Sequence, residues 1–516
     1  MEKTGQKTFE TLDEASIHIE ELTRERDLYK TLAEQLAGEI KLKNRKLFAP
    51  SSEKSDGEQL QLFNEAESTA DSSVPEPEIE EISYKRKKQK GKREADLSKL
   101  ETVRIDYELE EDERICPQCE GSLHDMGADL HRELTIVPAR IYVTEHAAHK
   151  YACRNCDINA TKTPIIKAKA PKPLIPKSLA SATLIAHTIA NKYTLALPLY
   201  RQEADWKAKG IDISRANMAN WILKTAQAVT PVWEQMKCDL LALEVLHADE
   251  TTMQVLKEPG KKAATKSYMW LYRSSGDTTH PLILYEWKKS RSAQCAQEFL
   301  GDFSRYMHAD GHEAYHKLTG PTIVGCMAHV RRKFSDALSI LDEHARKDSL
   351  ALAGLSYCNR LFKLEEDWTD VSSDERFKLR LEKSKPVFEE FIAWAKSAKV
   401  LPKSPPGKAI QYLLNQEPYL KNIYLDGRLE LSNNRAERSI KPFVIGRKNW
   451  LFATSVKGAK SSAILYSIVE TAKENNLKVF EYLTYLFERL PNTSPEHVKD
   501  LCPHSDKLPE ELYITK

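Results

Sequence analysis

Two short segments of the chain share a form that places an aspartate at the end of a strand-like run. EVLHADETTMQVL and RYMHADGHEAYHKL each carry His-Ala-Asp, with Asp249 in the first and Asp310 in the second. A third carboxylate, Glu437, lies in SNNRAERSIKPFVIGRKNW, and no acidic residue follows it from 438 to 460. A strand-end aspartate is commonly a turn residue, and an acid in a first helical turn can simply favour the helix dipole. The repeated form nevertheless makes these three acids candidate ligands of a catalytic metal.

Clustered carboxylates suit metal-dependent phosphodiester chemistry. Two ions about 4 Å apart can activate an attacking hydroxyl and stabilise the leaving oxygen. Carboxylate oxygens are hard ligands that suit Mg²⁺, which binds few of them together with substrate phosphate; Mn²⁺ could take its place. Cations after Glu437 would hold DNA phosphates. The candidates for this role are Arg438, Lys441, Arg447 and Lys448. Asn433 and Asn434 are candidate supporting residues or plain helix caps.

The elements around these acids follow a definite order. Two further strand-like runs, KSYMWLYRSS and PLILYEWKKS, follow the first, and SAQCAQEFLGDF is predicted to be a helix. A strand that ends at Asp310 comes next, and TIVGCMAHVRRKF then predicts a strand leading into a helix. Three strands, a helix and a strand with a second acid form the order of the RNase H-like fold, in which the two acids lie on adjacent central strands.

The spacing of the acids predicts an inserted domain. The interval from Asp310 to Glu437 is much longer than that from Asp249 to Asp310, and most of it has a helical pattern. The predicted parts are a catalytic core at 241–334, a helical insertion at 335–428, the rest of the core at 429–491 and a C-terminal tail at 492–516.

Four cysteines in a module at 99–160 form two Cys-x-x-Cys pairs. They are Cys116, Cys119, Cys153 and Cys156. Each pair can place two thiolates on one ion, and two pairs complete a tetrahedral four-sulfur zinc site. The segment between the pairs alternates as strands do, which favours a zinc ribbon. Because four thiolates leave no open position, we expect one structural Zn²⁺.

A helical module is predicted at 178–240, after a proline- and lysine-rich basic linker at 161–177. LYRQEADWKAKG ends on a glycine suited to a helix C-cap, and ISRANMANWILKTAQAV begins after a natural N-cap, Ser214. Short helices joined by tight turns suggest a helix-turn-helix DNA reader, with Arg215 and Asn217 as contacts. Three packed helices are also common in proteins that never touch DNA.

The N-terminal part is predicted to be a coiled coil followed by a linker. Residues 8–48 place mostly apolar residues at heptad positions a and d, so we expect at least a homodimer, although Arg26 and Lys43 weaken the seam. The alternative is an amphipathic helix packed on its own protein. Residues 49–98 contain few aliphatic residues and run from acidic to basic, which predicts a disordered linker.

Composition and charge limit the cellular location and the partners that we expect. With 77 Lys and Arg against 76 Asp and Glu in 516 residues, no global field draws the chain onto nucleic acid, although basic runs such as AHVRRKF occur. A polar N-terminus and the absence of a long apolar stretch predict a cytoplasmic protein with no membrane partner, nucleoid-associated when on DNA. In that reducing setting the nine cysteines are thiols or metal ligands rather than disulfides.

These motifs together resemble the insertion-sequence-66 family of transposases, DDE enzymes with an RNase H-like catalytic domain. The resemblance rests on ICPQCEGSLHDMG, YACRNCD, HADETTMQV, HADGHEAY and CMAHVRRKF, and above all on SNNRAERSIKPFVIGRKNWLFATSVKGAKSSA. It implies that Asp249, Asp310 and Glu437 are the catalytic triad. It also implies terminal inverted repeats and target DNA as partners, with accessory proteins encoded by the same element.

Three further residues acquire a meaning from the resemblance. Cys326 and His329 match a Cys-x-x-His element of several DDE transposase groups, which implies a supporting role without metal. His312 departs from the family pattern, where an aromatic residue is expected.

The expected protein is therefore a multidomain α+β DNA transposase that cleaves its element's ends and joins the 3′-OH to target DNA. Two other functions stay open. A metallohydrolase would use His247, His308, His312 and His316 beside the aspartates. A non-enzymatic, zinc-dependent DNA-binding regulator would need none of the acids.

Overall fold

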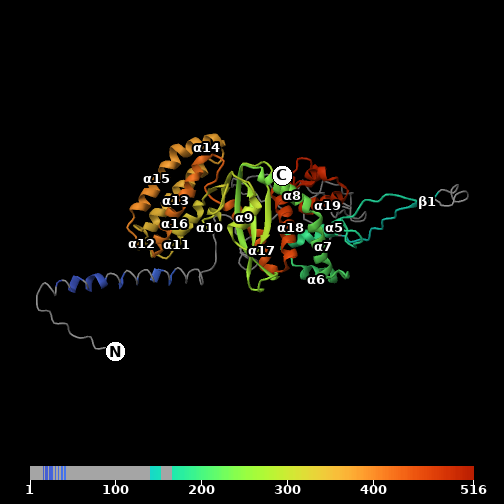
Figure 1. The fold of residues 1–516 in the computed structure, drawn as a ribbon, viewed down its shortest axis with the longest axis horizontal. Helices are drawn as coiled ribbons and strands as arrows, with labels where there is room; N and C mark the ends of the chain where they lie inside the picture. Colours follow the sequence, from blue (N-terminus) through green and yellow to red (C-terminus); the bar gives the residue numbers. More distant parts are fainter. Residues whose placement is uncertain are drawn as a thin grey trace, which may run out of the picture. The chain divides into compact units, whose positions relative to one another are not determined.

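The computed structural model describes residues 140–152 and 165–515, together with scattered positions between 16 and 41. The predicted zinc-binding cysteines, the linker at 49–98 and most of the predicted coiled coil lie outside the described residues. The chain divides into two compact units, residues 50–149 and the remainder. The fold that follows is that of the second unit, from residue 150 onward (Figure 1).

Four helices precede the main sheet, after a small antiparallel pair of β1 (Lys150–Ala152) and β2 (Ile165–Lys167). The helices are α5 (Ala182–Tyr193), α6 (Leu199–Ala208), α7 (Arg215–Ala228) and α8 (Thr230–Leu241). The predicted cap of α7 is confirmed, because the Ser214 hydroxyl accepts the Asn217 N–H at 3.2 Å. Gly210 has a φ of +76°, which a residue without Cβ adopts without strain.

The central sheet has the strand order β5-β4-β3-β6-β7. Its strands are β3 (Val245–Lys257), β4 (Lys266–Ser274), β5 (Ile283–Lys288), β6 (Tyr306–His308) and β7 (Thr322–Val324). The first three pair antiparallel, whereas β6 pairs parallel with both β3 and β7. A short strand, β8 (Ala453–Ser455), adds to the far end of β3 in parallel.

Helices cover both faces of this sheet. On one face, α9 (Ala293–Leu300) and α10 (Glu313–His316) pack through aromatic rings, with Tyr272 stacked on Phe299 at 3.8 Å between centroids. On the other face lie α17 (Asn434–Trp450) and α18 (Val456–Glu474), and the Tyr285 hydroxyl of β5 donates to the Ser439 carbonyl of α17. Side chains alternate between faces along a strand, so each β3 residue faces one helical layer.

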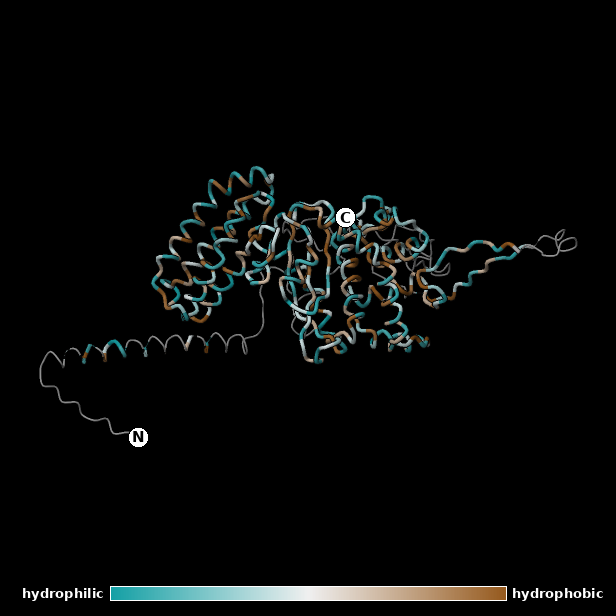
Figure 2. The backbone as a smooth tube through the Cα atoms, viewed as in Figure 1, coloured by the Kyte–Doolittle hydropathy of each residue, from teal (hydrophilic) through white to brown (hydrophobic). Residues whose placement is uncertain are grey.

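The helices between the second and third acids share a second buried core with Val245 of β3 and Val324 of β7. They are α11 (Met327–Ser339), α12 (Glu343–Arg346), α13 (Leu350–Asp367), α14 (Ser373–Leu379), a π-helical turn (Arg380–Ser384), α15 (Lys385–Ser397), α16 (Pro405–Leu420) and a 3₁₀ turn (Lys421–Leu425). A second buried cluster, which includes Phe334, Phe391 and Leu413, holds them together. Figure 2 shows hydrophobic and polar residues alternating along these helices, as an amphipathic packing requires.

The C-terminal residues pack onto the fold rather than forming a free tail. After α19 (Val479–Arg489) come three 3₁₀ turns (Leu490–Asn492, Pro495–Leu501 and Glu510–Leu512). Cys502 is fully buried, and Leu477 forms an isolated β-bridge with Tyr513. In the described part of the chain no helix is both long and apolar enough to cross a membrane.

Candidate active site

The two aspartates come from neighbouring parallel strands. The register pairs His247 of β3 with His308 of β6, and Asp249 and Asp310 each follow two residues later. Parallel pairing therefore places both carboxylates on the same face of the sheet, the face that α17 covers. Asp310 lies just beyond the end of β6, whereas Asp249 lies within β3, which continues to Lys257, so the expected strand-end position of Asp249 is wrong. Burial, and to a lesser degree repulsion from Glu250 and Asp310, raises the pKa of the Asp249 carboxyl well above its ordinary value. The site thus concentrates negative charge where little water screens it.

Glu437 lies in the first turn of α17, and Asn433 fixes the start of that helix on β3. The Asn433 side chain is 1% exposed and does not cap α17. Its Nδ2 donates to the Ala248 carbonyl at 2.8 Å, and its Oδ1 lies 3.0 Å from His247 Nδ1. Asn433, which bonds to the residue before Asp249, thereby holds the helix that carries Glu437. Repulsion from Glu437 also contributes to the raised pKa of Asp249, so these two carboxylates feel each other.

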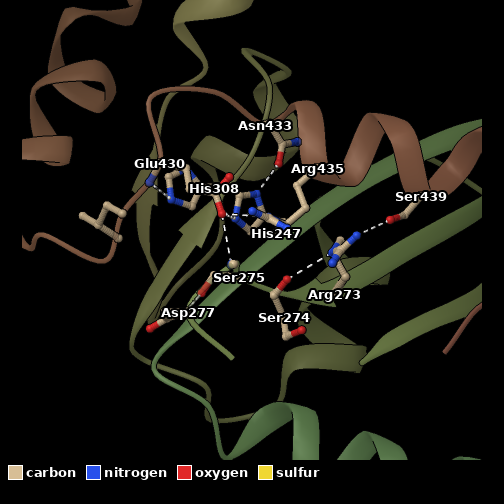
Figure 3. A network of polar contacts seen from close by, with 12 residues as sticks. His247, Arg273, Ser274, Ser275, Asp277, His308, Glu430, Asn433, Arg435 and Ser439 are labelled. Carbon is tan, nitrogen blue, oxygen red and sulfur yellow. Dashed lines mark hydrogen bonds and ion pairs between the residues drawn. The ribbon is translucent and has the colours of Figure 1, made fainter. Parts of the chain in front are cut away.

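A buried pair of histidines, His247 and His308, lies two residues before the two aspartates in the sequence, and Figure 3 shows this pair with its polar partners. The His247 and His308 rings are fully buried and stacked, with centroids 4.3 Å apart and planes 15° apart. His308 Nε2 accepts the Glu430 N–H at 3.1 Å, and burial lowers the pKa of His308 well below its ordinary value, so the ring is neutral. The Glu430 carboxylate lies 3.5 Å from His247 Nε2 and 2.8 Å from Arg435 Nε, and these partners lower its pKa despite burial.

This network bears on the metallohydrolase alternative. Each imidazole uses one ring nitrogen to hold Asn433 or the Glu430 backbone rather than turning it toward the aspartates. His312 caps α10, and its backbone N–H donates to Asp310 Oδ1 at 3.0 Å. His316 stacks on Tyr419. In these contacts the histidines near the acids pack and position neighbouring groups, and Asp249 and Asp310 are the partly exposed carboxylates of the site.

Two arginines that sequence reasoning missed lie on the acids. Arg291 pairs with Glu250 and reaches within 3.8 Å of Asp310 Oδ2. Arg332 Nη2 lies 3.3 Å from Glu437 Oε2, and its side chain is 56% exposed. The basic run AHVRRKF was the one signal for Arg332; nothing in the sequence pattern indicates Arg291. Both guanidinium groups supply positive charge at the place where a metal would supply it.

Cys326 and His329 lie at the start of α11, close to Glu437 of α17. Cys326 is 4% exposed, and burial raises the pKa of its thiol to about 11. His329 Nδ1 is 3.7 Å from Glu437 Oε1, and burial lowers the pKa of the imidazole. Of the described residues, one set of three or more His, Cys, Asp or Glu brings all its ligand atoms within 4.8 Å of one another, and it is Cys326, His329 and Glu437. The three acids form no set that tight.

The predicted phosphate contacts fall into different environments. Arg438 and Lys448 on α17 are exposed, and Lys441 is half-buried. Arg447 is directed inward and hydrogen-bonds Thr251 and Thr252 of β3. At the start of α7, Arg215 is 69% exposed and lies near Glu203, and Asn217 is also exposed. Arg438 and Lys448 on α17, and Arg332 on α11, are therefore exposed cations on the two helices that meet at Glu437.

The fold and site define a mixed α/β protein, mostly helical, with acidic residues on one face of the sheet and arginines close to them. Comparison with protein families identifies it further. The family described as "Transposase IS66 family" matches residues 177–461, and the "IS66 C-terminal element" matches 467–504. The "zinc-finger binding domain of transposase IS66" matches 113–157, and "Transposase C of IS166 homeodomain" matches 35–105. The chain belongs to the IS66 family of transposases.

Relatives in Sinorhizobium fredii (strain NBRC 101917 / NGR234) extend over most of the chain. The uncharacterized protein y4qI is 32% identical over 431 residues, which are 80% of this chain and 76% of the relative. The uncharacterized protein y4hP is 28% identical over 410 residues, which are 75% of this chain and 72% of the relative. Neither name states an activity. Family membership makes DNA the partner, and the zinc-finger match spans all four predicted zinc-binding cysteines.

Proposed function

We propose that this chain is a DDE-type transposase that cleaves DNA at the ends of its element and joins the freed 3′-OH to target DNA. One observation carries the proposal: Asp249 and Asp310 each follow the paired histidines of adjacent parallel strands by two residues, and Asn433 joins the helix of Glu437 to the first of these strands. The strand order, with three antiparallel strands followed by two parallel ones, is the order expected of an RNase H-like core and supports the same proposal.

We infer that Asp249, Asp310 and Glu437 hold Mg²⁺, for which Mn²⁺ could substitute. The donor set fits, because carboxylate oxygens are the ligands this ion prefers and the crowded charges raise the pKa of Asp249, a strain that a cation relieves. When bound, two ions would activate the attacking hydroxyl and stabilise the leaving oxygen. The family's zinc-finger segment would carry a separate structural Zn²⁺ on Cys116, Cys119, Cys153 and Cys156.

The protein's own cations would position the DNA. Arg438 and Lys448 extend to solvent from the helix of Glu437, so their charges can reach backbone phosphates. Lys441 belongs to the same proposed surface, and Arg447 would join it only by giving up its bonds to β3. Arg332 would move from Glu437 to a phosphate once metal neutralises the carboxylate. Arg215 and Asn217 on α7 are proposed to read the terminal repeats.

We further propose that the protein acts as at least a dimer through residues 8–48. The described positions there are helical, and Ile19, Leu22, Tyr29 and Ile40, which fall at heptad positions a and d, are each more than half exposed. A second copy would bury these side chains as a coiled coil does. The domain boundaries given above, and participation of accessory proteins, belong to the same proposal.

The test is metal-dependent cleavage of a duplex that carries the element's end. Asp249→Asn should abolish nicking in Mg²⁺, because it removes a ligand charge while keeping the side-chain shape. Glu313→Gln is the matched control, since Glu313 is an exposed acid three residues beyond Asp310, paired with Lys317. A DNA-binding regulator without catalysis would show no nicking in any variant, and loss of activity in both variants would contradict the assignment.

A further inference from the structure

We propose that Cys326, His329 and Glu437 form a binding site for a thiophilic divalent cation such as Zn²⁺, which shares Glu437 with the proposed magnesium site and is separate from the zinc finger. This inference rests on the proposed function only for its consequence for catalysis. The site itself rests on three side chains that converge on one point, with ligand atoms all within 4.8 Å of one another.

The spacing of His329 and Glu437 suits a small tetrahedral ion. Bonds of about 2.0–2.1 Å to nitrogen and oxygen separate two ligands of a tetrahedral zinc by about 3.3–3.4 Å. His329 Nδ1 and Glu437 Oε1 are 3.7 Å apart, which is too long for a hydrogen bond. Closing that difference requires a shift of only a few tenths of an ångström, within the range of side-chain rotation.

Both facing atoms lack another partner. His329 Nδ1 and Glu437 Oε1 are buried atoms with no hydrogen-bond partner among the described residues. Buried polar atoms are normally satisfied, and an unpaired one calls for an explanation. Arg332 occupies the other carboxylate oxygen, Oε2, at 3.3 Å. Glu437 can therefore hold Arg332 with one oxygen and present the other to an ion.

The sulfur has the environment of a metal-bound cysteine. Cys326 is the residue immediately before α11, so its Sγ lies beside the first turn of a 13-residue helix, and burial keeps the unbound thiol protonated. The Asn433 backbone N–H also donates to Sγ at 3.1 Å. His329 lies one turn further along α11, on the same side of the helix. An arriving ion would displace the thiol proton to solvent.

The ligand types separate this site from the magnesium site. Thiolate and imidazole favour Zn²⁺ and disfavour Mg²⁺, which takes oxygen ligands. Three protein ligands leave a fourth position for water, unlike a closed four-sulfur site. Glu437 is shared with the proposed catalytic metals. Zinc bound here would hold the Glu437 side chain against α11, away from Asp249 and Asp310. We therefore expect zinc to inhibit magnesium-dependent cleavage.

Zinc content tests the site without reference to activity. Full-length wild type and variants are equilibrated with buffered Zn²⁺, and bound metal is measured by mass spectrometry of the dialysed protein. Wild type should hold one zinc per chain more than Cys326→Ser and one more than His329→Gln. Cys238→Ser is the matched control, since Cys238 is an exposed thiol on α8, and should retain the wild-type content. Equal content in wild type and both site variants would overturn the proposal.

A spectroscopic readout guards against misfolded variants. Co²⁺ in place of zinc should give wild type an additional sulfur-to-cobalt absorption that Cys326→Ser lacks and His329→Gln retains at lower metal affinity. His329 is partly exposed, so His329→Gln should fold, which circular dichroism checks. An identical cobalt spectrum in wild type and Cys326→Ser would exclude sulfur ligation.

The inhibition is measured as a ratio within each protein. Zinc added to a magnesium reaction should reduce wild-type cleavage at least about tenfold, whereas the residual activity of Cys326→Ser should change less than about twofold. If wild type binds the additional zinc but its cleavage is not inhibited, the claim that Glu437 is shared between the two sites is wrong. If no protein cleaves DNA even without zinc, the proposed function fails, and the zinc content still decides whether the site exists.

Discussion

Replacement of Asn433 by alanine should disable catalysis by loosening the helix that carries Glu437. The side chain joins α17 to β3 through a 2.8 Å bond to the Ala248 carbonyl and a 3.0 Å contact with His247 Nδ1. Removing it leaves both buried partners unsatisfied. Each unsatisfied buried group costs about 1–3 kcal/mol, so the free energy of unfolding should fall by about 2–6 kcal/mol.

The catalytic effect should exceed what lower stability explains. A misplacement of about 1 Å at a reacting group can cost about 100-fold in rate, so nicking should fall by about that factor at a temperature where the variant is folded. Rates are compared on the same element-end duplex in Mg²⁺, and near-ultraviolet circular dichroism establishes the folded state.

The control comes from the other end of the same helix. Asn449→Ala removes one bond from α17, that from Nδ2 to the Ala196 carbonyl at 2.9 Å. It should cost about 1 kcal/mol of stability and change nicking less than about threefold. Near-normal nicking by folded Asn433→Ala would refute the idea that this residue positions Glu437.

Three further predictions concern charge. The folded-state pKa of Asp249 is raised, so the contribution of this group to stability is present at low pH and is lost as pH rises through that pKa. The melting temperature of the metal-free protein should therefore fall over this pH range. The melting temperature of Asp249→Asn should fall less over the same range. The pKa of His308 is lowered and the ring is neutral, so its contribution to stability is present above the unfolded pKa of about 6.5 and is lost as pH falls. Below that pH, the melting temperature of His308→Gln should depend less on pH than that of the wild type. Arg332→Ala should strengthen Mg²⁺ or Ca²⁺ binding without DNA and weaken DNA binding, as titration calorimetry and electrophoretic mobility would show, since the guanidinium competes for Glu437 at 3.3 Å. Weaker metal binding by Arg332→Ala would contradict the competition.

Local signals made the strands and helices around the acids predictable. The run around Asp249 predicted a strand that the structure places within one residue, at Val245–Lys257. The cap at Ser214 and the left-handed conformation of Gly210 were readable because each depends on a single residue and its immediate neighbours. The helical character of the interval between Asp310 and Glu437 was predictable from its sequence pattern.

Contacts between distant segments were not predictable in the same way. Asn433 looks like a helix cap in sequence, yet its side chain binds β3, which lies nearly two hundred residues earlier. Arg291 reaches Asp310 only because the start of α9 folds back to the sheet edge. The C-terminal residues were expected to be a tail, whereas Leu501 and Cys502 are buried against the fold. A single sequence does not indicate which distant residues come into contact, because these contacts depend on the tertiary fold.

The central claim is that three acids, two from strands and one from α17, act as one site. The direct measurement is cleavage and strand transfer by full-length wild type and Glu437→Gln on the element's ends in Mg²⁺, with DNA binding measured in parallel. The account predicts that Glu437→Gln binds the ends but neither cleaves them nor joins a pre-cleaved 3′-OH to target DNA. Wild-type cleavage and joining by Glu437→Gln would contradict it.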